Sequence, residues 1–177
     1  MTEFPRLETE RLFLREYQSA DVDELATIYS DPEVVRFLAQ GQTRSRAECQ
    51  ERLTAAIFRW NQYRLPIWAV TLKATGRWIG RCGFQPKEDD EPEVVELAYG
   101  YARWAWGHGY ATEAGLAMAR WAFDQGIEQV IALVRPTNSR AAAMVRRIGM
   151  EWIGETEKYH DLRLQVFRLR PGDLSAG

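Results

Sequence analysis

The chain has 177 residues, of which 46% are hydrophobic and 27% are charged, the composition of an ordinary soluble domain. Its 23 Lys and Arg residues against 25 Asp and Glu residues give a formal net charge of −2, so no basic excess points to nucleic acid. No run of about 18 apolar residues could cross a membrane, and the first residues lack the pattern of a signal peptide. We therefore expect a cytoplasmic protein with no nucleic-acid or membrane partner.

The chain has two cysteines, Cys49 and Cys82, and two histidines. One pair of cysteines does not make a disulfide framework, and no spacing is typical of a zinc site. We expect both cysteines to be buried as small hydrophobic side chains, and we expect no metal. Seven tryptophans are unusual for this length, and they indicate aromatic packing in the core or a pocket lined by rings.

Hydrophobic patterning and cap signals in the first half of the chain predict strands over 11–15, 67–72, 78–84 and 94–101 and helices over 21–30 and 45–63. Each helix should begin at a capping signature, in which Asp21 or Ser45 is followed three residues later by Glu. The first helix should end at Asp31, because the residue before a proline disfavours helical backbone. The second and third strands should form a hairpin around Gly76, and 85–93 should be a polar surface loop.

The second half predicts helices over 109–124 and 138–148 and strands over 130–134, 152–157 and 164–169. Gly126 and Gly149 should end the two helices. The resulting order of elements predicts an α+β (mixed α/β) fold, with a mixed sheet of about seven strands flanked by about four helices. We expect a single domain over 1–170 and a flexible C-terminal tail over 171–177.

The chemically informative stretch runs from Trp104 to Ala114, between a predicted strand and a predicted helix. Gly107 and Gly109 allow a sharp turn and a close approach of the backbone to a ligand. The amides that follow begin a helix and have no acceptor within it, which suits a phosphate or pyrophosphate. The alternative is a tight turn that binds nothing. A Walker loop would need a Gly-Lys pair, and a Rossmann fingerprint would need a third glycine where Thr112 stands.

Four motifs occur in order, at 7–15, at 31–35, at 96–99 with 106–114, and at Asn138 with 147–150. Together they make the sequence resemble the GNAT superfamily of acyl-CoA-dependent N-acetyltransferases, and within it the RimJ/RimL-like branch of ribosomal-protein N-terminal acetyltransferases. The resemblance covers nearly the whole chain. It implies a mostly antiparallel sheet whose fourth and fifth strands splay apart.

The resemblance also implies where acetyl-CoA, the expected cosubstrate, would bind. Backbone groups at Tyr99, Gly100 and Tyr101 would pair with the pantetheine arm, and Asn138 would hydrogen-bond it. The pyrophosphate would lie on the backbone amides of the glycine loop, which comprises Trp106, Gly107, His108, Gly109, Tyr110, Ala111 and Thr112. By its sequence position alone Asn138 is a helix N-cap, and the two roles are compatible.

Two features depart from the family pattern. Relatives usually carry Gln or Arg three positions before the first loop glycine, where this chain has Trp104; the neighbouring Arg103 could lend charge instead.

The second departure concerns the general acid. The tyrosine or serine that serves in many relatives is replaced by Val145 or Ala141, which leaves Ser139, Tyr159 or water. A thiolate with a pKa near 8.5 needs little help from an acid at neutral pH.

Glu96 is the candidate general base, on the strand that borders the acyl end of the cleft in relatives. Strand alternation puts it on the face of Ala98 and Gly100, whose small side chains would leave room for substrate. The alternative is an ordinary solvated or ion-paired glutamate. Tyr159 and His160, between the last two strands, are candidate contacts to the acceptor.

The sequence thus favours an acetyl-CoA-dependent N-acetyltransferase that transfers the acetyl group directly to an amine, with a protein or peptide α-amine as the expected acceptor. No nucleophilic Cys or Ser arrangement suggests a covalent intermediate. A small-molecule acetyltransferase for an amino sugar, antibiotic or polyamine is the alternative, and a non-catalytic acyl-CoA sensor is another. The expected partners are acetyl-CoA and the amine, and a homodimer is left open.

Overall fold

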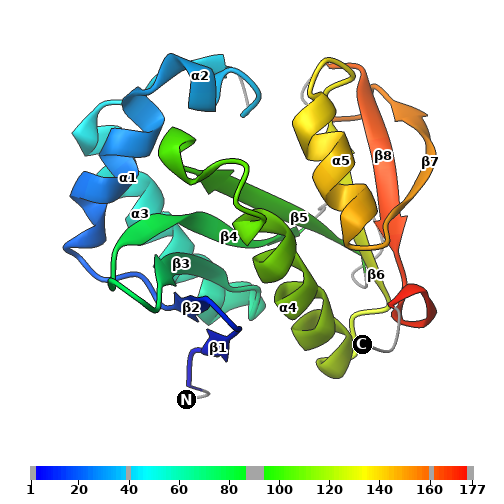
Figure 1. The fold of residues 1–177 in the computed structure, drawn as a ribbon, viewed down its shortest axis with the longest axis horizontal. Helices are drawn as coiled ribbons and strands as arrows, with labels where there is room; N and C mark the ends of the chain where they lie inside the picture. The colour runs from blue at the N-terminus through cyan, green and yellow to red at the C-terminus, as the bar shows by residue number, and fades with distance from the viewer. Residues whose placement is uncertain (1–2, 39–40, 87–93, 160–161, 175–177) are drawn as a thin grey trace. The chain divides into compact units, whose positions relative to one another are not determined.

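The computed structural model describes residues 3–38, 41–86, 94–159 and 162–174. Within these ranges the chain forms eight strands and five α-helices, and the strands are hydrogen-bonded in the order β1-β2-β3-β4-β5-β6-β8-β7 (Figure 1). This confirms the expected mixed, mostly antiparallel α+β fold, with one strand and one short helix more than the sequence predicts. Backbone contacts divide the chain into two compact units, one of residues 1–83 with 99–110 and the other of residues 84–98 with 111–177.

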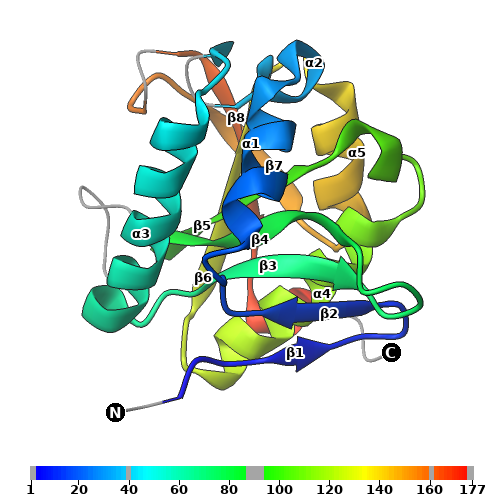
Figure 2. The same ribbon diagram turned by 90° about the vertical axis from the view of Figure 1, so that its left-hand side faces the viewer.

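The first unit combines an antiparallel sheet with three helices. Its elements are β1 (Leu7–Glu8), β2 (Leu12–Arg15), α1 (Asp21–Ser30), α2 (Pro32–Val35), α3 (Arg46–Tyr63), β3 (Ile67–Leu72) and the larger part of β4 (Trp78–Pro86). The β3–β4 hairpin turns at Gly76, whose φ of +67° favours glycine, as expected. Figures 1 and 2 show α1 and α3 lying against β3 and β4, and the side chains between them form one hydrophobic core.

The two predicted capping signatures differ in outcome. At α3 the prediction is confirmed, because Ser45 and Glu48 form a capping box. At α1 it is wrong in mechanism, because Ala20 is the N-cap and makes no side-chain cap. The predicted end at Asp31 is correct for α1, but Asp31 then caps a second helix, with its carboxylate accepting from the amide of Glu33.

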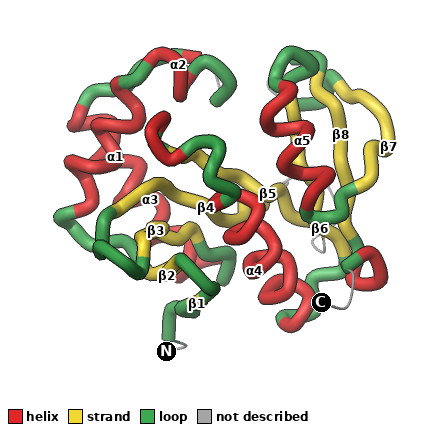
Figure 3. Tube along the Cα trace, in the orientation of Figure 1, coloured by secondary structure: helices red, strands yellow, loops and turns green. Residues whose placement is uncertain are grey.

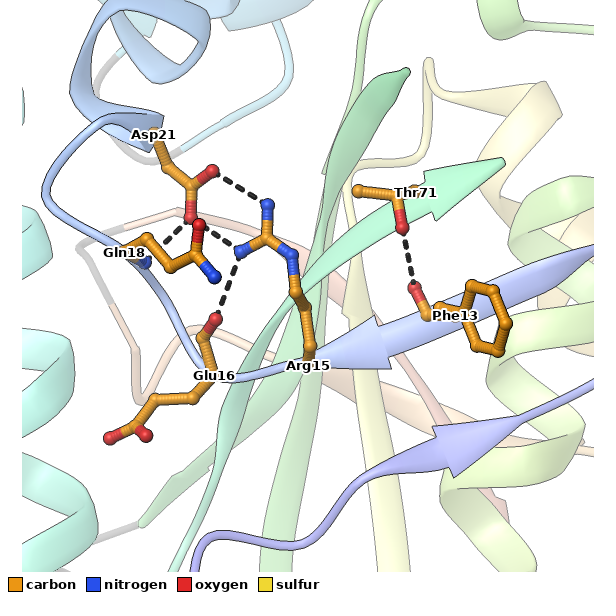
Figure 4. A network of polar contacts seen from close by, with 6 residues as sticks. All are labelled: Phe13, Arg15, Glu16, Gln18, Asp21 and Thr71. Carbon is orange, nitrogen blue, oxygen red and sulfur yellow. Dashed lines mark hydrogen bonds and ion pairs between the residues drawn. The ribbon is translucent and has the colours of Figure 1, made fainter. Parts of the chain in front are cut away.

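Asp21 instead anchors the polar network drawn in Figure 4. Its two carboxylate oxygens accept hydrogen bonds of 2.7 and 2.8 Å from both terminal nitrogens of Arg15, and one of them also accepts from the amide of Gln18 at 2.7 Å. Asp21 is only 5% exposed. The carboxylate therefore joins the end of β2 to the start of α1.

The second unit consists of the remaining strands with two longer helices. Its elements are the first part of β5 (Val94–Tyr101), α4 (Tyr110–Asp124), β6 (Gln129–Val134), α5 (Ser139–Arg147), β7 (Glu151–Thr156) and β8 (Leu164–Leu169). β8 pairs antiparallel with both β6 and β7, and Figure 3 shows β7 beside β8. Gly126 and Gly149 follow the two helices with φ of +83° and +94°, as predicted.

The strand that ends at the glycine loop has a short parallel ladder. β5 and β6 pair over three residues, from Val94 with Gln129 to Glu96 with Ile131, although β5 runs on to Tyr101 and β6 to Val134. β5 and β6 correspond to the fourth and fifth strands predicted from the sequence, because β1 was not foreseen. Strands that splay apart can pair only at one end, so the short ladder between β5 and β6 agrees with the expected splay.

Both expectations about packing are confirmed in the described residues. Cys49 and Cys82 are buried, at 0% and 1% exposure. Aromatic side chains pack together, with the ring of Phe4 edge-on to Trp60 at 5.2 Å between centroids and Phe84 stacked on Trp121 at 6.0 Å.

Four further expectations concern the C-terminal tail, the single domain, membrane crossing and the loop over 85–93. Residues 171–173 form a 3-10 turn at the start of the expected tail, and residues 175–177 lie outside the described residues. The single domain over 1–170 and the flexible tail stay predictions. The helices described here are all too short or too polar to cross a membrane. Residues 87–93 of the predicted loop lie outside the described residues. Gln85 and Pro86, which were assigned to the same loop, form the end of β4.

Candidate functional site

The glycine loop turns twice through left-handed backbone before α4 begins. Gly107 and Gly109 have φ of +82° and +81°, a conformation that L side chains rarely adopt, so both positions need glycine. Both are exposed, and a Cβ built on Gly107 would meet nothing within 4 Å. The amides that start at Tyr110 form the first turn of a 15-residue helix. The loop thus has open space at Gly107, just before a helix N-terminus.

Contacts within the loop and with Arg11 hold the loop in place. The indole nitrogen of Trp106 donates to the carbonyl of Tyr101 at 2.9 Å. A terminal nitrogen of Arg11 donates to the carbonyl of His108 at 3.0 Å, and the same guanidinium lies 4.8 Å from the centroid of the Tyr110 ring. The His108 and Tyr110 rings stack at 5.5 Å. Sequence reasoning missed Arg11, because its contact spans 97 residues and no local pattern signals it.

The charges beside the loop differ from the expectation. The Nε atom of Arg103 lies 3.1 Å from a carboxylate oxygen of Asp31, so this arginine is paired with the acid that caps α2. Trp104 is 42% exposed, and the guanidinium of Arg77 lies over its ring at 3.7 Å from the centroid. Arg77 comes from the β3–β4 hairpin and was not foreseen as a site residue.

The end of β5 leads into the loop. Tyr99 and Tyr101 have their rings 6.3 Å apart, and burial raises the pKa of Tyr99 above its ordinary value, so its phenol keeps its proton at neutral pH. A Cβ on Gly100 would lie 3.8 Å from Leu38 and 4.0 Å from the Nε of Arg81. The expected pairing of this backbone with pantetheine stays a prediction.

The second unit carries the other predicted residues. Glu96 is half-buried and lies opposite Ile131 in the β5–β6 ladder. Asn138 is the N-cap of α5, and its side-chain oxygen accepts from the amide of Ala141 at 3.1 Å, which confirms the capping interpretation. The side-chain NH2 group of Asn138 takes no part in this bond. Tyr159 is half-buried with the Lys158 ammonium 5.3 Å from its ring, and His160 lies outside the described residues.

The positions considered for an acid also belong to this unit. Val145 is fully buried in α5, whereas Ser139 is exposed in the first turn of that helix. Ala111 and Thr112 occupy the first turn of α4. The first unit thus brings Tyr99–Tyr110 together, and the second holds Glu96, Asn138 and Tyr159.

Neither cysteine is suited to be a nucleophile. Burial raises the pKa of the Cys82 thiol from its ordinary value of 9.0 to about 12, and burial likewise raises the pKa of Cys49. Both therefore remain thiols at neutral pH, and the thiolate is the reactive form.

Comparison with known proteins agrees with this geometry. Residues 11–151 match the family described as Acetyltransferase (GNAT) domain. The uncharacterized protein YkkB of Bacillus subtilis (strain 168) is 28% identical over 162 residues, which cover 88% of this chain and 90% of YkkB. The uncharacterized N-acetyltransferase p20 of Bacillus licheniformis is 26% identical over 154 residues, 86% of each chain.

Solved structures share the fold. An acetyltransferase from Agrobacterium tumefaciens str. C58 superposes with a TM-score of 0.81 at 24% identity, covering 96% of both chains. RimL, a ribosomal L7/L12 α-N-protein acetyltransferase in complex with coenzyme A, gives 0.80 at 15% identity over 94% of this chain and 98% of its own. AAC(6')-Ib in complex with ribostamycin and coenzyme A gives 0.78 at 17% identity over 93% and 96%.

The matched family spans most of the chain, including the strand, the glycine loop and α4 described above. The protein therefore belongs to the GNAT acetyltransferase family and is an N-acetyltransferase.

Proposed function

We propose that this N-acetyltransferase uses acetyl-CoA and that the glycine loop binds the pyrophosphate of the cosubstrate. The observation that carries the proposal is the pair of exposed left-handed glycines immediately before α4. Amides at a helix N-terminus attract a phosphate through hydrogen bonds and the helix dipole. Two solved proteins of the same fold, RimL and AAC(6')-Ib, are described in complex with coenzyme A.

In the proposed reaction the neutral amine attacks the thioester carbonyl. A C–N bond forms, the C–S bond breaks, and the thiolate of coenzyme A leaves. Glu96, or water, takes the proton that the nitrogen loses, and a backbone amide near Tyr99 stabilises the negative charge on the carbonyl oxygen. Positioning of the two substrates provides most of the rate. Direct transfer agrees with the raised pKa of both cysteines.

For the acceptor we favour a protein or peptide α-amine, as in the RimJ/RimL-like branch. Supplying the neutral form of a lysine amine, with a pKa near 10.4, costs about 4 kcal/mol at pH 7.4. The same step costs only about 0.5 kcal/mol for an α-amine with a pKa near 7.8. The chain has Val145 and Ala141 where relatives carry a general acid. With few residues for acid–base catalysis, the site suits an amine that is already partly neutral.

A small-molecule amine is the second candidate, and a specific observation favours it. The AAC(6')-Ib structure, described with the aminoglycoside ribostamycin, resembles the chain as closely as RimL does, with TM-scores of 0.78 and 0.80. Amino sugars of lowered pKa satisfy the same energetic argument.

The cytoplasmic location and the option of a homodimer also stay part of the proposal. Cell fractionation tests the location, and sedimentation tests the oligomeric state.

The deciding experiment is a competition within one peptide that carries a free N-terminus and an internal lysine. We expect acetylation of the N-terminus at neutral pH, located by mass spectrometry. Predominant lysine acetylation would contradict the α-amine proposal and indicate a stronger base. A parallel panel of amines, followed by release of free thiol, distinguishes the small-molecule enzyme. Binding of acetyl-CoA without turnover on any amine would favour the sensor.

A further inference from the structure

The glycine loop lacks the basic residue that its relatives place at its start, and Arg11, which lies against the loop, donates to the carbonyl of His108 at 3.0 Å. Trp104 occupies the position, and Arg103 pairs with Asp31 at 3.1 Å. A phosphate on this loop would then meet amide dipoles but no full positive charge from 103 or 104.

The structure holds Arg77 directly over Trp104. The guanidinium lies 3.7 Å from the ring centroid, against 4.8 Å for Arg11 over Tyr110 and 5.3 Å for Arg64 over Trp60. The backbone at Arg77 is fixed as well, because its amide donates to the Thr75 hydroxyl at 3.3 Å and its carbonyl accepts from Leu72 at 2.9 Å. Both residues belong to the first unit.

Among the described residues, Arg77 forms no ion pair with an acid. In the part of the chain that the structure describes, no carboxylate lies within 4.0 Å of its guanidinium, whereas several other arginines of the same unit are paired. The paired arginines are Arg15, Arg36, Arg44, Arg46 and Arg103. Arg77 is also exposed, so its nitrogens can reach a ligand.

A stacked guanidinium is well suited to bind phosphate. The ring covers one face of the planar group and leaves its edge, which carries the N–H donors, open to a bidentate partner. The stacking also fixes the orientation in advance, so less conformational entropy is lost on binding.

We propose that Arg77, held against Trp104, binds a phosphate group of the acyl-CoA cosubstrate. The inference rests on the proposed use of acetyl-CoA. The phosphate is either the pyrophosphate or the 3′-phosphate, and the experiment separates these two sources.

The test compares acetyl-CoA binding by calorimetry in Arg77→Gln and in Arg64→Gln. Arg64 is the matched control, because it also stacks on a tryptophan, Trp60, at 5.3 Å in the same unit but at the end of α3. Arg77→Gln should raise the Kd about five- to tenfold and weaken its dependence on salt, while Arg64→Gln stays within about twofold of the parent. Trp104→Leu should weaken binding in the same direction, and the double variant should lose little more.

Acetyl-dephospho-CoA, which lacks the 3′-phosphate, identifies the group. If the penalty of Arg77→Gln disappears with this compound, Arg77 binds the 3′-phosphate; if it persists, Arg77 binds the pyrophosphate. Equal Kd values for Arg77→Gln and Arg64→Gln, both folded by circular dichroism, would overturn the inference. Failure of the parent protein to bind acetyl-CoA would instead overturn the proposed function.

Discussion

The Nε atom of Arg81 on β4 donates a 2.8 Å hydrogen bond to the phenolic oxygen of Tyr29 on α1. Both side chains are buried, at 8% and 2% exposure. Burial alone would raise the pKa of Tyr29, but the positive charges of Arg81 and Arg52 outweigh it and lower that pKa below its ordinary value of 10.0. The phenol therefore compensates a buried cation inside a hydrophobic core.

Removal of this one oxygen should destabilise the first unit. We expect Tyr29→Phe to lower the free energy of unfolding by about 1.5–3 kcal/mol, because the guanidinium of Arg81 loses its acceptor while staying buried. Urea denaturation measures the change, with Tyr63→Phe as the control, since Tyr63 is 43% exposed. Equal stability of the two variants would show that the bond contributes nothing.

The carboxylate of Asp21 offers a test between two roles. Asn caps a helix as well as Asp does, so a capping role predicts almost no cost for Asp21→Asn. The ion pair with Arg15 predicts a loss of about 3 kcal/mol, because a neutral amide leaves a half-buried guanidinium without its charge partner. Thermal and urea unfolding measure the loss, and a value below about 0.5 kcal/mol would show that the ion pair adds little to stability.

The loop glycines should be needed for acetyl-CoA binding and not for folding. Gly109→Val places a β-branched side chain at φ +81° and also brings a Cβ within 3.5 Å of Arg11. We expect the Kd for acetyl-CoA to rise at least about tenfold. Gly126→Val is the control, because it imposes the same strain at φ +83° behind α4. If both variants bind acetyl-CoA as the parent does, the pyrophosphate assignment is wrong.

Substitution of Glu96 tests its role as the base. Glu96→Gln should lower kcat by about a hundredfold or more while leaving the acetyl-CoA affinity within about twofold, and it should alter the acidic limb of the pH–rate profile. Glu128→Gln, at an exposed position just before β6, is the control for loss of a negative charge. An unchanged rate and profile in Glu96→Gln would leave this residue a structural one.

Stability should fall as the solution becomes alkaline. Burial holds the pKa of Cys82 at about 12 in the folded protein, against 9.0 ordinarily, so only the unfolded chain loses this proton between those values. The contribution is complete below pH 9 and is lost as the pH rises toward 12, at up to about 1.4 kcal/mol per pH unit. Cys82→Ala should show a shallower decline in urea unfolding between about pH 8 and pH 10. Parallel curves for variant and parent would contradict this assignment.

Much of the secondary structure could be predicted because its signals are local. The capping box at Ser45 and the left-handed glycines at Gly76, Gly126 and Gly149 lie within the elements they start or end. The two missed elements are short: β1 has two residues and α2 four, too few for a period to emerge. Asp21 was misassigned because a carboxylate at the start of a helix has the same spacing whether it caps the helix or binds a distant arginine.

In the candidate site, too, the local features could be predicted and the long-range contacts could not. The glycine loop is one continuous stretch, so its turn and its helix were visible in the sequence. Arg11 and Arg77 reach it only through strand pairing and the β3–β4 hairpin, and no spacing in the sequence brings them there. Arg103 was expected to lend its charge to the loop, but it pairs with Asp31. That pairing could not be predicted, because Asp31 lies close to Arg103 only in the folded chain.

The two indole rings around the loop give the protein an optical probe of its own. Trp104 is exposed beneath Arg77, and Trp106 is hydrogen-bonded to the last residue of β5, whereas Trp68 is fully buried. A ligand on the loop would change the surroundings of the first two rings, and the emission lost in Trp104→Leu gives the share of the signal that comes from Trp104. Intrinsic fluorescence, compared between the parent and Trp104→Leu, can therefore follow the occupation of the site in real time without any label.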